Sequence, residues 1–131
     1  MVEIIQLIHN YAHLADAAKF EPVESEPQQR LALVFTQDGV FDATQVNGGE
    51  RWGGLDAIRE MFARPKPSHT PAHMTTNVYV YEDGDTVRVK SKWQAAYWDR
   101  EGMRLGDYDD VVVHTADGWR IRERVVTVRH G

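Results

Sequence analysis

The chain contains no cysteine, and this absence removes several kinds of chemistry at once. Disulfide bonds, thiol nucleophiles and thiolate metal sites are all excluded. No apolar run approaches the roughly 20 residues that a membrane-spanning helix requires. No basic segment followed by an apolar one opens the chain, as it would in a signal peptide. We therefore expect a cytoplasmic protein with no part in a membrane.

Basic residues are also in the minority, with 15 Lys and Arg against 20 Asp and Glu and a formal net charge of −5. They are scattered along the chain, so neither duplex nucleic acid nor an anionic membrane surface is an expected partner. The 131 residues, of which 42% are hydrophobic, are enough for one domain with a core of its own. We expect residues 1–131 to form a single domain.

The first half of the chain predicts helices. Apolar residues recur with helical period from Val2 to about Phe20. A shorter second helix is expected over Gln28–Thr36, and a third over Leu55–Phe62, where Arg64-Pro65-Lys66-Pro67 would end it.

The second half of the chain predicts strands. It is rich in Val, Tyr, Trp and Thr, and Asp-Gly and Glu-Gly pairs divide it, as in hairpins. The expected strands are a short one at Val40–Val46 and long ones at His73–Tyr81, Thr86–Asp99, Met103–Thr115 and Trp119–Val128. Helices followed by a meander indicate the α+β class. Because long strands twist and bend, we expect a curved antiparallel sheet with about three N-terminal helices enclosing a pocket.

Three segments carry candidate site residues. If His73 opens a strand, His73, Thr75 and Asn77 share one face, and an imidazole is the usual proton-transfer group near neutral pH. The alternative is that His73 only caps the strand. Tyr11 lies within the apolar stripe of the first helix, whereas Asp16 is rotated about 140° from it and is equally consistent with a solvated carboxylate at the helix end.

The last two strands supply the remaining candidates. Tyr108 and Asp110 share a face of their strand. In the last strand, strict alternation places Arg124 on the face opposite Ile121, where arginines are usually solvated. A buried Arg124 would need a β-bulge or a carboxylate partner.

A metal site is not expected. His9 and His13 are spaced i, i+4, but no third ligand accompanies them. The glycine-rich segments Asn47–Glu50 and Trp52–Gly54 have the wrong spacing for a phosphate loop or a dinucleotide site.

Taken in order along the chain, these landmarks resemble the SnoaL-like branch of the nuclear transport factor 2-like superfamily. The points of similarity are a first helix with Tyr11 and Asp16, the passage Leu33–Asp42, Gly54, His73-x-x-x-Asn77, Gly106-x-Tyr108-x-Asp110 and Gly118-Trp-Arg-Ile-x-x-Arg124. The likeness covers nearly the whole chain and is nearest in pattern to the scytalone dehydratase, bile acid dehydratase and lindane dehydrochlorinase group.

The resemblance implies a cone-shaped α+β barrel around an apolar pocket, and chemistry without a cofactor. It implies His73 as a base oriented by Asp16, with Tyr11, Asn77, Tyr108 and Arg124 as substrate-binding residues. The enzyme it implies is a dehydratase-type lyase or an isomerase acting on a small, hydrophobic, cyclic and oxygenated molecule.

Two other functions stay open at this point. One is a non-catalytic protein of the same fold that binds a small molecule, and the other is an association module. Large apolar groups on both faces of the strand from Thr86, among them Trp93, Tyr97 and Trp98, also lead us to expect a homodimer or homotrimer.

Overall fold

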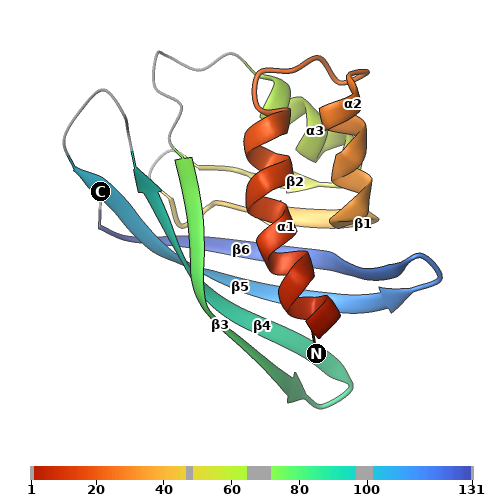
Figure 1. Ribbon diagram of the computed structural model, residues 1–131, viewed down its shortest axis with the longest axis vertical. Coiled ribbons are helices and arrows are strands. Elements are labelled where there is room, and N and C mark those ends of the chain that lie inside the picture. The colour runs from red at the N-terminus through yellow and green to blue at the C-terminus, as the bar shows by residue number, and fades with distance from the viewer. Residues whose placement is uncertain (1, 47–48, 65–71, 97–101, 131) are drawn as a thin grey trace.

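The computed structural model describes residues 2–46, 49–64, 72–96 and 102–130. Its helices lie in the first half of the chain and its long strands in the second (Figure 1). The helical elements are α1 (Val2–Ala18), α2 (Glu26–Gln29), the 3₁₀ turn η1 (Arg30–Leu33) and α3 (Leu55–Ala63). No helix in this described part is long and apolar enough to cross a bilayer.

Six strands form one curled sheet in the order β2-β1-β6-β5-β4-β3. They are β1 (Phe35–Asp42), β2 (Arg51–Gly53), β3 (Ala72–Asp83), β4 (Thr86–Ala96), β5 (Met103–Thr115) and β6 (Gly118–His130). The predicted α+β class with a curved sheet is confirmed. The sheet is mixed rather than wholly antiparallel, because β1 pairs with β6 in parallel. The helices lie on one side of the sheet, with α1 crossing it (Figure 1).

The apolar stripe of α1 faces the core as the periodicity predicts. The buried residues of this helix are Ile4, Leu7, Ile8, Tyr11, Ala12, Ala15 and Ala18. Burying such side chains stabilises a fold by roughly 25 cal/mol for each Å² of apolar surface removed from water. This burial fixes which side of α1 meets the sheet and so where the side chains on its flanks lie.

The helix predicted over Gln28–Thr36 is wrong in its second half. Helical structure ends at Leu33, and Phe35 already belongs to β1. The Val34 carbonyl accepts a hydrogen bond from the Ile121 amide, and Phe35 pairs with the same residue of β6. Pairing with a strand 86 residues later in the chain therefore overrides the local helical pattern. For the same reason, the strand predicted at Val40–Val46 begins and ends earlier in the chain, as β1.

A β-bulge in β6 decides the orientation of Arg124. Val112 lies opposite Ile121, but Val111 lies opposite Glu123, so Arg122 is an extra residue between the two pairs. The extra residue reverses the alternation, and both Ile121 and Arg124 are fully buried. The face that strict alternation predicts for Arg124 is therefore wrong, and the bulge named as the condition for its burial is present.

A second bulge, in β3, has the opposite effect on Asn77. The pairing with β4 shifts between Thr76 and Tyr79, and Asn77 has a φ of 56°, the left-handed conformation that asparagine tolerates better than most residues. Asn77 is exposed, whereas His73 and Thr75 are partly buried. The prediction that Asn77 shares a face with His73 and Thr75 is wrong, because a bulge cannot be recognised in the alternation.

Candidate functional site

The end of α1 and the start of β3 bring Asp16 and His73 together. One oxygen of the Asp16 carboxylate, Oδ1, lies 2.9 Å from His73 Nδ1, and the other, Oδ2, accepts a 3.2 Å hydrogen bond from the His73 backbone amide. Both side chains are partly buried, with exposed fractions of 32% and 22%. Two hydrogen bonds to one residue fix both the strand end and the ring, so Asp16 is not a free, solvated carboxylate.

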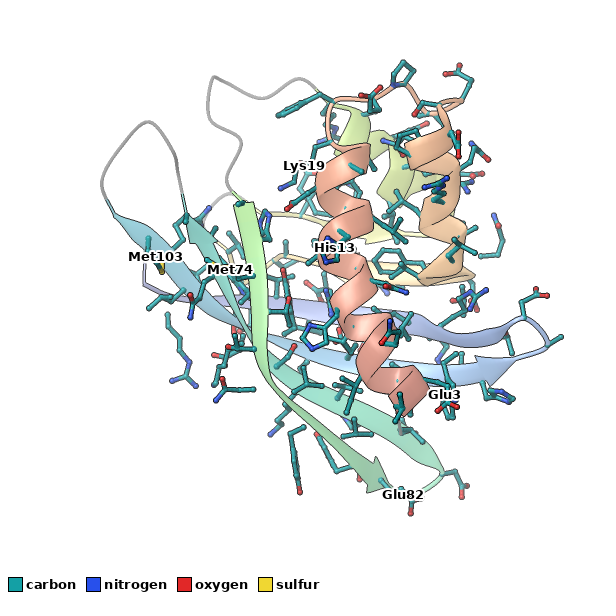
Figure 2. All side chains as sticks on the ribbon, viewed as in Figure 1. Glu3, His13, Lys19, Met74, Glu82 and Met103 are labelled. Atoms are coloured by element: carbon teal, nitrogen blue, oxygen red, sulfur yellow. The ribbon has the colours of Figure 1, made fainter. Side chains whose placement is uncertain are left out.

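Lys19 completes this group, and the sequence analysis did not select it. Its Nζ atom lies 3.3 Å from Asp16 Oδ1 and 2.9 Å from His73 Nδ1, and its side chain is only 9% exposed. Figure 2 shows Lys19 at the end of α1, directly after its last residue, Ala18, and near the start of β3. In the sequence, the signal that could have pointed to Lys19 was its i, i+3 spacing from Asp16. We call Asp16, Lys19 and His73 the histidine cluster.

The carboxylate of the histidine cluster is held in its ionised form. Partial burial alone would raise the pKa of Asp16, but the hydrogen bond from His73 and the charge of Lys19 outweigh it, so that the pKa lies below its ordinary value. An ionised carboxylate can only accept a hydrogen bond, and an ammonium group can only donate one. When Nδ1 donates to Asp16, the other ring nitrogen of His73, Nε2, keeps its lone pair and is able to take up a proton.

A second polar group lies deeper, on β5 and β6. Arg124 Nε and Nη2 donate to the two carboxylate oxygens of Asp110 at 2.7 and 2.8 Å, and both side chains are fully buried. The guanidinium lies between two aromatic rings, 4.1 Å from the ring centre of Tyr11 and 3.8 Å from that of Tyr108. Cation–π contacts of this kind gain strength when water is excluded. We call Tyr11, Tyr108, Asp110 and Arg124 the arginine cluster.

Charge and burial set the protonation states of the arginine cluster. Burial raises the pKa of Tyr11 to about 12 and that of Tyr108 well above its ordinary value, so both phenols are proton donors at neutral pH. Burial alone would lower the pKa of Arg124, but the charge and hydrogen bonds of Asp110 more than compensate, so the guanidinium stays protonated. Arg124 Nη1 is buried without a hydrogen-bond acceptor among the described residues.

Trp93 on β4 connects the two clusters. Its ring centre lies 6.5 Å from that of His73 and 6.2 Å from that of Tyr108. Its Nε1 donates to the Thr127 carbonyl at 3.1 Å, which fixes the indole against the sheet. The opposite residue on β5 is Gly106, where an added Cβ would lie 2.4 Å from the indole. A side chain larger than glycine at position 106 would therefore displace Trp93.

The structure thus brings together five of the six residues selected from the sequence as site residues: His73, Asp16, Tyr11, Tyr108 and Arg124. Tyr11 and Asp16 come from α1, and His73, Tyr108 and Arg124 come from the face of the sheet that α1 crosses. Asn77 is the exception, since it lies exposed on its bulge. Within the described ranges, no three His, Asp or Glu side chains gather as metal ligands would.

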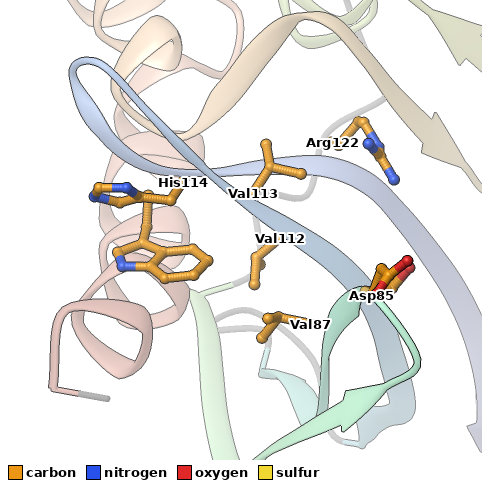
Figure 3. Close-up of a pocket in the computed structure, with 8 residues that line it drawn as sticks. Asp85, Val87, Val112, Val113, His114 and Arg122 are labelled. Atoms are coloured by element: carbon orange, nitrogen blue, oxygen red, sulfur yellow. The ribbon is translucent and has the colours of Figure 1, made fainter.

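A hollow of about 230 Å³ lies at the other end of β4, away from both clusters. Figure 3 shows Val87 and Val112 at its centre, with Asp85 and Arg122 on one side and His114 on the other. The His114 ring packs against Trp119, with ring centres 5.1 Å apart. His73 pairs with Ala95 near one end of β4, whereas Val87 is near the opposite end. This hollow is therefore separate from the pocket predicted beside His73.

Comparison with solved structures supports the fold. A protein from Kribbella flavida, Kfla4162, superposes with a TM-score of 0.76 at 26% identity, covering 98% of this chain and 90% of that one. A Novosphingobium aromaticivorans protein provisionally assigned as an aromatic ring hydroxylase has a TM-score of 0.72 at 27% identity, with coverages of 99% and 89%. A further protein of that organism, provisionally assigned as a scytalone dehydratase, has a TM-score of 0.70 at 17% identity and covers 98% and 83%. At that identity the likeness concerns the fold alone.

Sequence comparison gives the family. A Mycobacterium tuberculosis protein is 30% identical over 132 residues, which cover 96% of this chain and 83% of the relative. The family described as the SnoaL-like domain matches residues 1–125, a span that includes both clusters. The chain belongs to the SnoaL-like domain family.

Proposed function

We propose that the chain is a cofactor-independent lyase of the dehydratase type, or an isomerase, in which His73 is the general base and Asp16 orients it. The substrate class we propose is a small, hydrophobic, cyclic and oxygenated molecule. The observation that carries the proposal is the 2.9 Å contact between Asp16 Oδ1 and His73 Nδ1, backed by the bond from Asp16 to the His73 amide.

The proposed proton transfer follows from this contact. Asp16 accepts a hydrogen bond from the Nδ1–H group, which selects the tautomer with a lone pair on Nε2 and stabilises the imidazolium that forms. Nε2 removes a proton from a carbon next to an activating group, and the C–H electron pair forms a double bond. In a dehydration, the C–O bond breaks with its electron pair on the departing hydroxyl, which takes the proton back from Nε2 and leaves as water. In an isomerisation, the proton returns to a different carbon. General base catalysis of this kind contributes about 10²–10⁴-fold.

The arginine cluster supplies hydrogen-bond donors for oxygen atoms of the substrate in this proposal. Tyr11 and Tyr108 keep their protons at neutral pH, and Arg124 Nη1 has donors to spare. Donors fixed in advance at a dry site are worth roughly 3–4 kcal/mol each when charge develops on the oxygen. The proposal therefore assigns substrate binding to these three residues and none to Asn77.

A non-catalytic binding protein of the same fold is the alternative. It would need the concave surface but not the contact between Asp16 and His73, so the contact favours the enzyme. An association module would present an apolar outer sheet face. Instead, the outer faces of β4 and β5 carry the cross-strand ion pairs Arg88–Asp109 and Lys92–Asp107. Tyr97 and Trp98 lie outside the described residues, and a homodimer or homotrimer stays a prediction for analytical ultracentrifugation.

The test begins with ligand identification by native mass spectrometry and by thermal-shift screening of hydroxylated steroids and polyketide-like aromatics. Ligands are then incubated with the protein in D₂O, and exchange of their carbon-bound protons is followed by NMR. We expect His73→Ala to reduce exchange about 10²–10⁴-fold and Asp16→Asn to reduce it as well. The matched control is His13→Ala, an exposed histidine on α1 (Figure 2). Undiminished exchange in His73→Ala would show that His73 is not the base.

A further inference from the structure

Arg104 lies on the same face of the sheet as His73, and no function has been assigned to it so far. In the register of the sheet, His73 lies opposite Ala95, and Ala95 lies opposite Arg104. Directly opposed residues of antiparallel strands point to the same face. The three residues therefore form one row across β3, β4 and β5 on the concave side. Two strand spacings separate the α-carbons of His73 and Arg104, which corresponds to about 10 Å.

Both ends of this row contact the same indole. The Arg104 guanidinium lies 5.9 Å from the ring centre of Trp93, and the His73 ring centre lies 6.5 Å from it. Between them Ala95 carries only a methyl group and is 2% exposed. The row therefore has a small apolar residue in the middle, a base at one end and a cation at the other.

The charge of Arg104 is not neutralised by the described residues. Among those residues its guanidinium contacts the Trp93 ring, and none of their carboxylates lies within ion-pair distance of it. Lys19, the other cation near His73, is paired with Asp16. Among the described residues around His73, Asp16, Lys19 and Arg104 therefore carry one surplus positive charge, although the whole chain has a formal net charge of −5.

Arg124 differs from Arg104 in this respect. It is fully buried, and Asp110 neutralises it through two hydrogen bonds. A charged ligand group beside Arg124 would add an unpaired charge to a dry interior, which is costly. Arg104 is only partly buried, and its guanidinium has the planar fork that matches a carboxylate.

We propose that Arg104 is a specificity-determining residue that binds a carboxylate group on the substrate whose reacting carbon lies at His73. This inference rests on the proposed function, because it concerns the same site. It adds that the hydrophobic ring bears an acidic substituent at the end away from the base. The cation–π contact with Trp93, at 5.9 Å from the ring centre, favours this position of the guanidinium before the ligand arrives.

The test uses pairs of probes that have the same ring and differ in charge: benzoate and benzamide, 2-naphthoate and 2-naphthamide, and cyclohexanecarboxylate and cyclohexanecarboxamide. Binding is followed by the shifts of the Trp93 indole and His73 ring resonances in NMR titrations at low salt. For at least one ring we expect the carboxylate to bind about fivefold more tightly than the amide, the factor typical of one partly exposed ion pair.

Three variants test whether the charge of Arg104 causes the preference for carboxylate. Arg104→Met keeps the cover over Trp93 without the charge, and we expect it to abolish the preference for carboxylate while leaving amide binding within about twofold. Arg104→Lys should keep part of the preference. Arg122→Met, which removes an exposed arginine from the bulge of β6, should leave it unchanged.

The outcomes separate the two proposals. Equal binding of carboxylate and amide to the wild type, or a carboxylate preference that survives in Arg104→Met, would overturn the role of Arg104 and leave the His73 base untouched. If none of the six probes shifts the Trp93 or His73 signals, the role of Arg104 is overturned, whereas the His73 base is tested separately by the proton exchange in D₂O.

Discussion

The two polar clusters on the concave side of the sheet differ in how their charges are balanced. In the arginine cluster, Arg124 and Asp110 are fully buried and neutralise each other through two hydrogen bonds. In the histidine cluster, His73 and Asp16 are 22% and 32% exposed, and two partners compete for a single ring nitrogen. The first arrangement is closed to water, and the second leaves an imidazole ring at the edge of the interior.

Because of this difference, we expect the two clusters to contribute differently to the stability of the fold and to catalysis. A buried charge that loses its partner destabilises the fold, because water cannot replace the partner. A partly exposed charge is screened by water and contributes little to stability. We therefore expect substitutions of the buried charges Arg124 and Asp110 to affect folding first, and those in the histidine cluster to affect activity first.

The largest effect is expected from Arg124→Met, which leaves the Asp110 carboxylate buried without a partner. We expect a loss of about 3–5 kcal/mol in the free energy of unfolding, measured by urea denaturation. The double variant Arg124→Met/Asp110→Leu should recover most of that loss, because it removes both charges. If the double variant is no more stable than the single one, unpaired charge is not the cause.

Gly106→Ala should have the next largest effect. The added Cβ would lie 2.0 Å from the Thr127 carbonyl oxygen and 2.4 Å from the Trp93 ring, so the strand or the indole must move. Overpacking of this kind costs about 1–3 kcal/mol, to be measured by thermal denaturation together with the shift of the Trp93 indole signal. Gly53→Ala is the matched control, since its nearest contact would be the end of the Arg51 side chain at 3.7 Å.

A smaller effect on stability is expected from Asp16→Asn. The pair is partly exposed, so the loss should stay below about 1 kcal/mol at neutral pH. Because the pKa of Asp16 is lowered from 3.8 by folding, its contribution is complete above that value and is lost as the pH falls through the lowered pKa. The stabilities of wild type and variant should therefore converge in acid. The free energies of unfolding can be compared by urea denaturation between pH 2 and 7. A difference between wild type and variant that persists at low pH would contradict this prediction.

The smallest effect at neutral pH is expected from Tyr11→Phe, and it should appear only in alkali. Folding raises the pKa of Tyr11 from 10.0 to about 12, so its contribution is present below pH 10 and is lost as the pH rises toward 12. Removing the phenol should make the free energy of unfolding decrease less steeply above pH 10. Equal slopes for the two proteins would show that Tyr11 ionises as readily when folded as when unfolded.

Local patterns in the sequence were sufficient to predict most of the helices and strands. The apolar stripe of α1, the turns at Asp83-Gly84 and Asp117-Gly118 and the strand from Met103 to Thr115 are where the sequence predicts them. The family resemblance, carried by short motifs in a fixed order, also led to the pairing of Asp16 with His73. Lys19 was missed because a single lysine three positions after an aspartate is ordinary on any helix.

By itself, the sequence determined the α+β class and which face of α1 is buried, because helical and strand periods depend on neighbouring residues. The tertiary structure alone decided the bulges that turn Arg124 inward and Asn77 outward, the end of the second helix at Leu33, and the row from His73 to Arg104. Each of these depends on the register between strands that are distant in the chain. A one-residue shift in that register reverses every following side chain, and no local pattern records it.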